Sequence, residues 1–350
     1  MNFGSDNMAG ASPEMLEALA RVNGGRAVPY GNDEVTDRVK DRIAEVFETA
    51  VEVFPVATGT AANALSIGLM CPAWGAVWCH PESHVNTDEC AAPEFYTGGA
   101  KLISVPGEHG RFTADALAAA LEYAGHRGVH EAQPAAVSIS QASECGTIYT
   151  LDEVAALSEV CRGRGLGLHM DGARFANALV AQGCSPAEAT WKAGVDILSF
   201  GATKNGALAA EAVVIFTEGL RARAAEMGFR RKRAAHLFSK MRFLSAQLEA
   251  YLTDDLWLRN ARHANAMAGR LAEGLAAIPG VSIAHPVEAN EIFPILPTAL
   301  RGGLRADGFE FYDWPDAGPD GVRLICAFDT AREDVEAFLA SARRHADAAA

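Results

Sequence analysis

Short apolar runs alternate with helical patterns along the first two-thirds of the chain. The runs are mainly apolar and do not alternate strictly with polar residues, which is typical of strands covered on both faces. Strands are expected at 51–56, 76–79, 101–105, 135–140, 166–170, 195–200 and 212–216. Repeated alternation of strand and helix predicts an α/β fold, with a mainly parallel seven-stranded sheet between helices.

The last third of the chain has longer helical patterns and shorter apolar runs. Helices are expected over about 230–253, 257–278 and 331–347. Short strands are expected near 281–284, 291–296 and 321–327, with turns rich in proline and glycine between them. The change of pattern predicts an N-terminal arm (1–30), a large domain (31–253) and a smaller α+β C-terminal domain (254–350).

Composition excludes several classes of protein. The chain has 350 residues, of which 49% are hydrophobic, and this is ample for a large core. The start, MNFGSDNMAG, lacks the basic and apolar parts of a signal peptide, and no apolar stretch approaches the roughly 20 residues that span a bilayer. A formal charge of −14 argues against nucleic-acid and anionic-membrane partners, and seven scattered cysteines favour reduced thiols. The sequence predicts a cytoplasmic protein.

An aspartate and a lysine stand at the ends of two predicted strands. Asp171 lies in HMDGARFAN (169–177), and Lys204 lies 33 positions later in SFGATKNG (199–206). A lysine amine can form an imine with the aldehyde of pyridoxal 5′-phosphate, while a buried carboxylate keeps the ring nitrogen protonated. Either residue alone could equally be a strand-end cap or a solvated lysine, so the interpretation depends on a third element.

The motif TGTAAN (58–63) supplies that third element. The apolar run VEVFPVA enters Thr58, Gly59 and Thr60, after which the composition favours a helix. Free backbone N–H groups at a helix start bind phosphate, and the threonine hydroxyls could add donors. The motif is neither the glycine-rich dinucleotide fingerprint nor a Walker motif. The three elements, in this order within an α/β frame, predict a pyridoxal-phosphate site.

With these motifs the chain resembles the threonine aldolases, within the β-eliminating lyase group of fold-type I pyridoxal-phosphate enzymes. The resemblance runs from FGSDN (3–7) to RLICAFDT (323–330), and GATKNG is more similar to the low-specificity or phenylserine-type branch. It implies cleavage of L-β-hydroxy-α-amino acids of the threonine, allo-threonine and phenylserine type to glycine and an aldehyde. The alternatives are another β-eliminating lyase, a transaminase or a hydroxymethyltransferase-like enzyme on the same fold. A non-catalytic or nucleotide-binding α/β protein is the alternative from another class.

The resemblance implies catalytic roles for histidines. His84, in HPESHVNTDE (80–89), matches the residue that stacks on the cofactor ring, and it is one candidate base for the substrate hydroxyl. His130, just before the predicted strand AAVSIS, is the other candidate. A zinc site is an alternative to consider, because four potential ligands lie close together in the sequence: Cys79, His80, His84 and Cys90. They form no four-ligand set with metal spacing, so no metal is expected.

The substrate carboxylate is best held by planar, bidentate arginines. Arg174, which is also expected beside the cofactor, and Arg323 match the carboxylate-binding positions of the family. Ser5 matches their hydroxyl partner. One departure from the family pattern lies nearby, because QASEC (141–145) stands where many members have ENTHN.

The resemblance also implies a dimer with shared sites, and often a tetramer. Tyr30, in YGNDEVT (30–36), matches a pocket-lining tyrosine on a loop that could reach the site of a neighbouring subunit. The phosphate-contacting arginine of the family has no unambiguous counterpart, since both Arg233 and Lys240 fall nearby. Lys240 is the predicted phosphate contact, and it is expected to act across a dimer interface.

Overall fold

The apolar runs of the first two-thirds of the chain form one seven-stranded sheet in the computed structural model, which describes residues 1–348. The strands are β1 Glu52–Val56, β2 Gly75–Cys79, β3 Lys101–Ser104, β4 Gln133–Ser140, β5 Gly167–Gly172, β6 Ile197–Gly201 and β7 Glu211–Ile215. In the order β1-β7-β6-β5-β4-β2-β3, every neighbouring pair is parallel except the two made by β7. The predicted α/β fold with a mainly parallel sheet is confirmed.

Helices cover both faces of this sheet, which explains why most of its strands are buried and mainly apolar. Adjacent residues of β7 show the two faces: Val213 belongs to a core cluster with residues of α3 and α10, and Val214 to another with residues of α2, α7 and α11. The helices of this larger lobe are α1 Pro13–Val22, α2 Glu34–Val46, α3 Gly59–Met70, α4 His84–Thr87, α5 Ala92–Thr97, α6 Ala114–Leu121, α7 Leu151–Gly163, α8 Phe175–Gln182, α9 Glu218–Arg221, α10 Ala224–Arg233 and α11 Arg242–Tyr251. Short 3-10 helices are η1 Asp6–Met8, η2 Gly128–His130, η3 Trp191–Ala193, η4 Thr203–Asn205 and η5 Thr253–Asp255.

The predicted continuous helix over 230–253 is wrong, because α10 and α11 are separate helices. Ala235 has a left-handed backbone with φ +61°, and the N–H of His236 donates back to the Arg231 carbonyl. This closes α10 in the way that a left-handed residue commonly ends a helix. A loop over 234–241 therefore separates the two helices.

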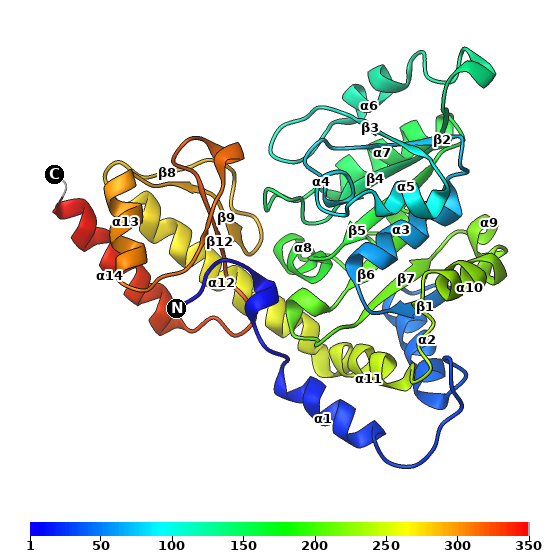
Figure 1. The fold of residues 1–350 in the computed structure, drawn as a ribbon, viewed down its shortest axis with the longest axis horizontal. Helices are drawn as coiled ribbons and strands as arrows, with labels where there is room; N and C mark the ends of the chain where they lie inside the picture. The colour runs from blue at the N-terminus through cyan, green and yellow to red at the C-terminus, as the bar shows by residue number, and fades with distance from the viewer. Residues whose placement is uncertain (349–350) are drawn as a thin grey trace.

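The last third of the chain forms a smaller lobe, as Figure 1 shows. This lobe has its own core. Its elements are α12 Leu256–Ala276, β8 Ser282–Ile283, β9 Glu291–Ile292, β10 Pro294–Ile295, α13 Thr298–Ala306, β11 Tyr312–Asp313, η6 Pro315–Ala317, β12 Val322–Ile325 and α14 Arg332–Asp347. Phe3 joins this core, so the chain begins against the smaller lobe. The helices and short strands expected here are confirmed, while the exact domain boundaries stay a prediction.

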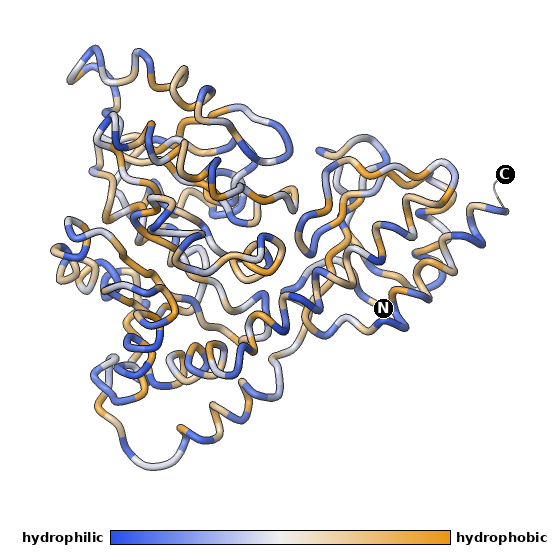
Figure 2. The backbone as a smooth tube through the Cα atoms, turned by 180° about the vertical axis from the view of Figure 1, so that it is seen from behind, coloured by the Kyte–Doolittle hydropathy of each residue, from blue (hydrophilic) through white to orange (hydrophobic). Residues whose placement is uncertain are grey.

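Helix α12 connects the two lobes. Leu256, Trp257 and Ala261, near its start, belong to the core of the larger lobe, whereas Ala268 and Leu271 belong to that of the smaller lobe. Figure 2 shows the alternation of apolar and polar residues along this helix. Among residues 1–348, no helix combines the length and the apolar character that crossing a membrane requires.

The parallel strands place their carboxyl ends at one edge of the sheet, which is where ligands bind in open α/β folds. Thr58 follows β1, His84 follows β2 and Lys204 follows β6. Asp171 is the second-to-last residue of β5. Loops far apart in the sequence therefore meet at this edge, facing the smaller lobe.

Candidate active site

Two adjoining cavities of about 690 and 250 Å³ lie at the carboxyl edge of the sheet, between the lobes. Both are lined by His84, Glu144 and Lys204. The smaller one is also lined by Ala57, Thr58, Gly59, Thr60, Asn63, Asp171 and Glu211, and the larger one by Ser5, Glu82, Asp88, Cys145, Arg174, Trp314 and Arg323. The structure thus brings most of the predicted site residues together.

Lys204 stands on a tight turn that is fixed by its neighbours. Asn205 donates to the Tyr251 hydroxyl and to the Trp257 carbonyl, both at 2.8 Å. Gly206 has φ +109°, and a Cβ there would meet the Asn260 amide at 2.8 Å, so only glycine fits. The turn is therefore held by the residues around the lysine, which leaves the lysine side chain to line the cavity.

Beneath this turn lies Glu211, a buried carboxylate of β7 that also lines the smaller cavity. It accepts hydrogen bonds from the backbone of Ala202 at 3.2 Å and of Thr203 at 3.4 Å. Burial raises the pKa of Glu211 to about 7, against the opposing effects of Thr203 and the Lys204 charge. The chain thus places an acid with a near-neutral pKa beside the lysine turn.

Asp171 is buried at the end of β5, where its register partners are Ser140 of β4 and Ser199 of β6. Its Oδ2 accepts from the Asn63 amide at 2.7 Å, and its Oδ1 accepts from the backbone of Ala173 at 3.0 Å. Both donors belong to the chain itself, and they hold the Asp171 side chain at the floor of the smaller cavity.

The turn after β1 has the features of a phosphate site. Thr58 is the N-cap of α3, and its hydroxyl oxygen accepts from the backbone of Ala61 at 3.2 Å. A Cβ added at Gly59 would meet no protein atom within 4 Å, so the protein's own packing does not require glycine there. The open space above Gly59 belongs to the cavity, at the positive end of the α3 dipole.

His84 begins α4, and its ring is half-buried. Its Nδ1 lies 2.9 Å from the Glu89 carboxylate, and this hydrogen bond raises the pKa of His84 above its usual value, although burial opposes it. In residues 1–348, His84, Glu89 and Asp171 are the one group of three potential metal ligands whose ligand atoms lie within 4.8 Å of one another. Of the four residues weighed for zinc, only His84 belongs to it, and the expectation of no metal stays a prediction.

Arg174 is buried between two carboxylates. Its guanidinium contacts both oxygens of Asp6, at 2.8 and 3.1 Å, and lies 3.1 Å from Glu291. Burial alone would lower the pKa of Arg174, but the two carboxylates raise it above the usual value. Burial also raises the pKa of Glu291 to about 7, whereas the charges of Arg174 and Lys204 outweigh burial and lower the pKa of Asp6. This cluster joins the N-terminal arm to both lobes.

Arg323 reaches the same cavity from β12 of the smaller lobe. Its guanidinium carbon lies 4.5 Å from the centre of the Trp314 ring, and Nη2 donates to the Gly4 carbonyl at 3.3 Å. Its Nε is buried and has no hydrogen-bond partner among the described residues. Stacking holds the guanidinium in place while donors remain for a ligand. Ser5 lies on the same cavity wall.

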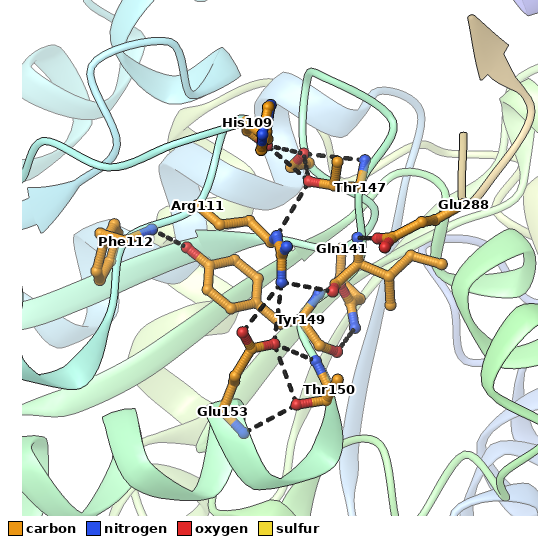
Figure 3. A network of polar contacts seen from close by, with 11 residues as sticks. His109, Arg111, Phe112, Gln141, Thr147, Tyr149, Thr150, Glu153 and Glu288 are labelled. Carbon is orange, nitrogen blue, oxygen red and sulfur yellow. Dashed lines mark hydrogen bonds and ion pairs between the residues drawn. The ribbon is translucent and has the colours of Figure 1, made fainter. Parts of the chain in front are cut away.

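The loop that follows β4, which carries the QASEC segment, forms another wall of the larger cavity. Gln141 exchanges two hydrogen bonds with the backbone of Tyr149, at 2.8 and 3.0 Å, and Glu288 of the smaller lobe accepts from the same loop at 2.7 Å (Figure 3). Glu144 and Cys145 lie between these hydrogen-bonded positions and line the cavity. The departure from the family motif therefore falls on the cavity wall.

Three predicted residues do not line the cavities of their own chain. His130 is exposed in η2, ahead of β4, whereas Asp171 lies beside the far end of that strand, roughly 23 Å away along the strand. The prediction that His130 is a base in the site of its own chain is wrong. His130 precedes β4, so it lies at the opposite edge of the sheet from the site. Tyr30 and Lys240 are exposed, and the backbone of Tyr30 donates to Ser239 at 3.1 Å. Their roles across a dimer interface stay predictions.

Several site residues were missed in the sequence. Asn63 and Glu89 lie inside the quoted motifs TGTAAN and HPESHVNTDE, and Asn63 follows Gly59 by one helical turn, which places it over the cavity. Asp6 lies within FGSDN. Glu211 and Glu291 had no signal, since a buried carboxylate is recognised only when its partners are known.

Comparisons with known proteins agree with this geometry. The model of the family described as Beta-eliminating lyase matches residues 2–298. Low specificity L-threonine aldolase of Pseudomonas aeruginosa is 45% identical over 334 residues, which cover 95% of this chain and 94% of that protein. The corresponding protein of a Pseudomonas sp. is 43% identical over 342 residues, covering 97% and 96%. The structure of Leishmania major threonine aldolase superposes with a TM-score of 0.91 at 29% identity, covering 99% of both chains.

Proposed function

Because this chain belongs to the beta-eliminating lyase family, we propose that it is an aldolase for L-β-hydroxy-α-amino acids of the threonine, allo-threonine and phenylserine type. The products are glycine and an aldehyde. The observation that carries this function is the placement of Lys204 and Asp171 on one cavity beside the Thr58–Thr60 turn. Relatives named low specificity L-threonine aldolase support the substrate class.

Pyridoxal 5′-phosphate is the proposed cofactor, and the residues present fit it. The backbone after Thr58 would hold the phosphate, Asp171 the ring nitrogen and Lys204 the aldehyde carbon, while His84 would cover one ring face. When bound, the cofactor supplies an electron sink for the carbanion that is left when the Cα–Cβ bond breaks. The empty space at Gly59 and the buried Asp171 carboxylate both support this placement.

Arg323 and Arg174 are proposed to bind the substrate carboxylate, with Ser5 as a hydroxyl partner. Arg323 has free donors on a stacked guanidinium, and Arg174 lines the same cavity despite its two internal ion pairs. Two fixed arginines set the orientation of the substrate, so the bond to be broken is held in one direction. His84, on the opposite wall, is the proposed base for the β-hydroxyl, and its Nε2 is the nitrogen that Glu89 does not occupy.

Product analysis by NMR tests this function. The purified, cofactor-loaded protein is expected to convert L-threonine to glycine and acetaldehyde, and L-threo-phenylserine to glycine and benzaldehyde, because the site holds an amino-acid carboxylate beside a base. Ammonia with a keto acid would instead identify an eliminating lyase, and transfer of the amino group a transaminase. No reaction with either substrate, from a protein that binds the cofactor, would contradict the proposal.

A dimer with shared sites is proposed as the minimal active form, and a tetramer as its assembly. Tyr30 and Lys240 support it, since they lie together on the surface and outside the cavities of their own chain. Among residues 1–348, Lys204 is the one lysine or arginine that lines the smaller cavity. A phosphate bound there would gain a second positive charge from Lys240 of another copy. A cytoplasmic location likewise stays a prediction from the sequence.

Mixing two inactive variants tests the shared site. In a mixed dimer of Lys204→Ala and Lys240→Glu chains, one site carries both substitutions and the other carries neither. Random mixing is then expected to restore about a quarter of the wild-type activity. Arg233→Glu serves as the control partner for Lys204→Ala, because Arg233 lines a separate surface cavity with Phe95 and Tyr96. No recovery after verified exchange of subunits would contradict Lys240 as a residue of the partner's site.

A further inference from the structure

A buried carboxylate lies behind two residues that line the site, His84 and Asn63. Glu89 is 4% exposed as a residue, and its side chain is inaccessible to solvent. Its Oε1 accepts from the Asn63 amide at 2.7 Å and lies 2.9 Å from His84 Nδ1. A buried charge is costly unless its neighbours stabilise it, so this arrangement requires an explanation.

The local backbone directs Glu89 inwards. His84 starts the single turn of α4, and the N–H of Asp88 returns to the His84 carbonyl at 2.9 Å. The chain then passes through Cys90 and Ala91, which both have left-handed backbones, with φ +49° and +60°. Such conformations are unfavourable for residues other than glycine and are kept where the surrounding structure requires them. They reverse the chain immediately after Glu89, so that its side chain lies beneath the imidazole.

Asn63 connects Glu89 to Asp171. The same Nδ2 group donates to Glu89 Oε1 and to Asp171 Oδ2, each at 2.7 Å. Two carboxylates this close would repel each other, and the two amide hydrogens are placed between them. The opposite orientation of the amide would direct its oxygen at both carboxylates, so the chemistry of the partners determines the assignment.

We propose that Glu89 is a positioning residue for the aldol cleavage: it binds His84 through Nδ1, directs Nε2 at the substrate hydroxyl and compensates the positive charge that the imidazole gains. The inference rests on the proposed function. As the Cα–Cβ bond breaks, the hydroxyl proton goes to Nε2, the O–H electron pair forms the carbonyl of the aldehyde, and the electron pair of the broken bond stays with the glycine fragment. Asn63 keeps Glu89 in place by joining it to Asp171.

Glu89 has the largest effect on the protonation of His84, while burial raises the pKa of Glu89 itself and its hydrogen bonds with His84 and Asn63 oppose that rise. Other charged groups face the imidazole: Glu144 from the loop after β4, Asp171 from β5 and Lys204 from η4, with Glu82 and Asp88 on the same cavity. The hydrogen bond to Glu89 is the largest influence and raises the pKa of His84, burial opposes it, and Lys204 lowers it. Loss of the Glu89 charge therefore lowers the pKa of His84, and the neutral, basic form persists to lower pH.

The test is Glu89→Gln, which keeps the shape of the side chain and removes its charge. The loaded variant is expected to lose about 10- to 100-fold in kcat/KM, and the acid limb of its pH profile is expected to move to lower pH. NMR titration of ¹⁵N-labelled histidine, with the His84 signal assigned from His84→Gln, should show the same direction in the cofactor-free protein. Glu94→Gln is the matched control, because Glu94 lies five residues further on and its side chain bonds neither His84 nor Asn63.

A double-substitution cycle separates positioning from a general structural role. If Glu89 acts through His84, then Glu89→Gln should cost less than about twofold when it is introduced into His84→Gln. An equal loss in both backgrounds, or an unchanged pH limb and histidine titration in a folded Glu89→Gln protein, would overturn the inference. If Glu89→Gln does not fold, Asn63→Ala is measured instead, because it frees Glu89 from Asp171. An unchanged titration of His84 in Asn63→Ala would overturn the inference. Absence of glycine from the wild-type protein would instead contradict the proposed function.

Discussion

Replacement of Lys204 by alanine is expected to abolish turnover, with a loss of at least roughly 10⁴-fold in kcat, the scale seen when a covalent nucleophile is removed. Among the described residues, Lys204 is the one lysine on either cavity, so no neighbouring amine can take its place. The measurement is the rate of glycine formation from L-threonine and L-threo-phenylserine. Borohydride reduction and mass spectrometry of the peptide carrying residue 204 should find the cofactor attached in the wild type and absent in the variant.

The Lys204→Ala protein is also expected to fold, because the turn does not depend on the lysine. Asn205 and Gly206 hold it, through Tyr251, Trp257 and the close approach of Asn260. Lys192→Ala provides the control, since Lys192 forms an ion pair with Glu48 away from the cavities. Glycine formation by Lys204→Ala at the wild-type rate would contradict the assignment.

Arg174→Gln is expected to lower both stability and activity. The substitution leaves the buried carboxylates of Asp6 and Glu291 without their shared cation, and breaking a buried ion pair in this way costs about 3–5 kcal/mol. Loss of a charge-assisted contact to the substrate contributes roughly 1.5–3 kcal/mol, which corresponds to about 10- to 150-fold in kcat/KM. Denaturant unfolding and steady-state kinetics measure the two effects separately.

The loss of stability should depend on pH. In the wild type the pKa of Asp6 is lowered, so its contribution to stability is present above the unfolded pKa and disappears as the pH falls through the folded pKa. Arg174→Gln removes that contribution, and the difference from the wild type should therefore shrink on acidification. Arg323→Gln is the matched control, because Arg323 has no ion pair among residues 1–348, and it should lose kcat/KM with little change in unfolding. Equal unfolding free energies for Arg174→Gln and the wild type would contradict the cluster's role.

The sheet could be predicted from the sequence because its physical cause is local. Strands buried on both faces are mainly apolar, and the seven runs match the observed strands within a few residues. The break between α10 and α11 could not be predicted in the same way. No glycine or proline marks it, and a left-handed alanine at 235 ends the helix instead. That conformation depends on contacts with distant segments, which a single sequence does not contain.

The site shows the same division. Asp171 and Lys204 follow their strands, so both lie at the carboxyl edge of the sheet. His130 precedes its strand, and the same rule could have placed it at the opposite edge. By contrast, Arg174 and Asp6 are 168 positions apart, and Glu291 lies further along the chain. No local sequence pattern predicts such a cluster, because only the fold brings its members together.

Helix α12 limits how this protein can be recombined with its relatives. A graft that cuts before Leu256 takes Leu256, Trp257 and Ala261 out of the larger core, and a cut after Ala276 takes Ala268 and Leu271 out of the smaller one. In both cases the cut exposes apolar core surface whose shape matches the original α12. The lobes are therefore not exchangeable modules. A substitution in α12 must therefore suit the packing of both cores.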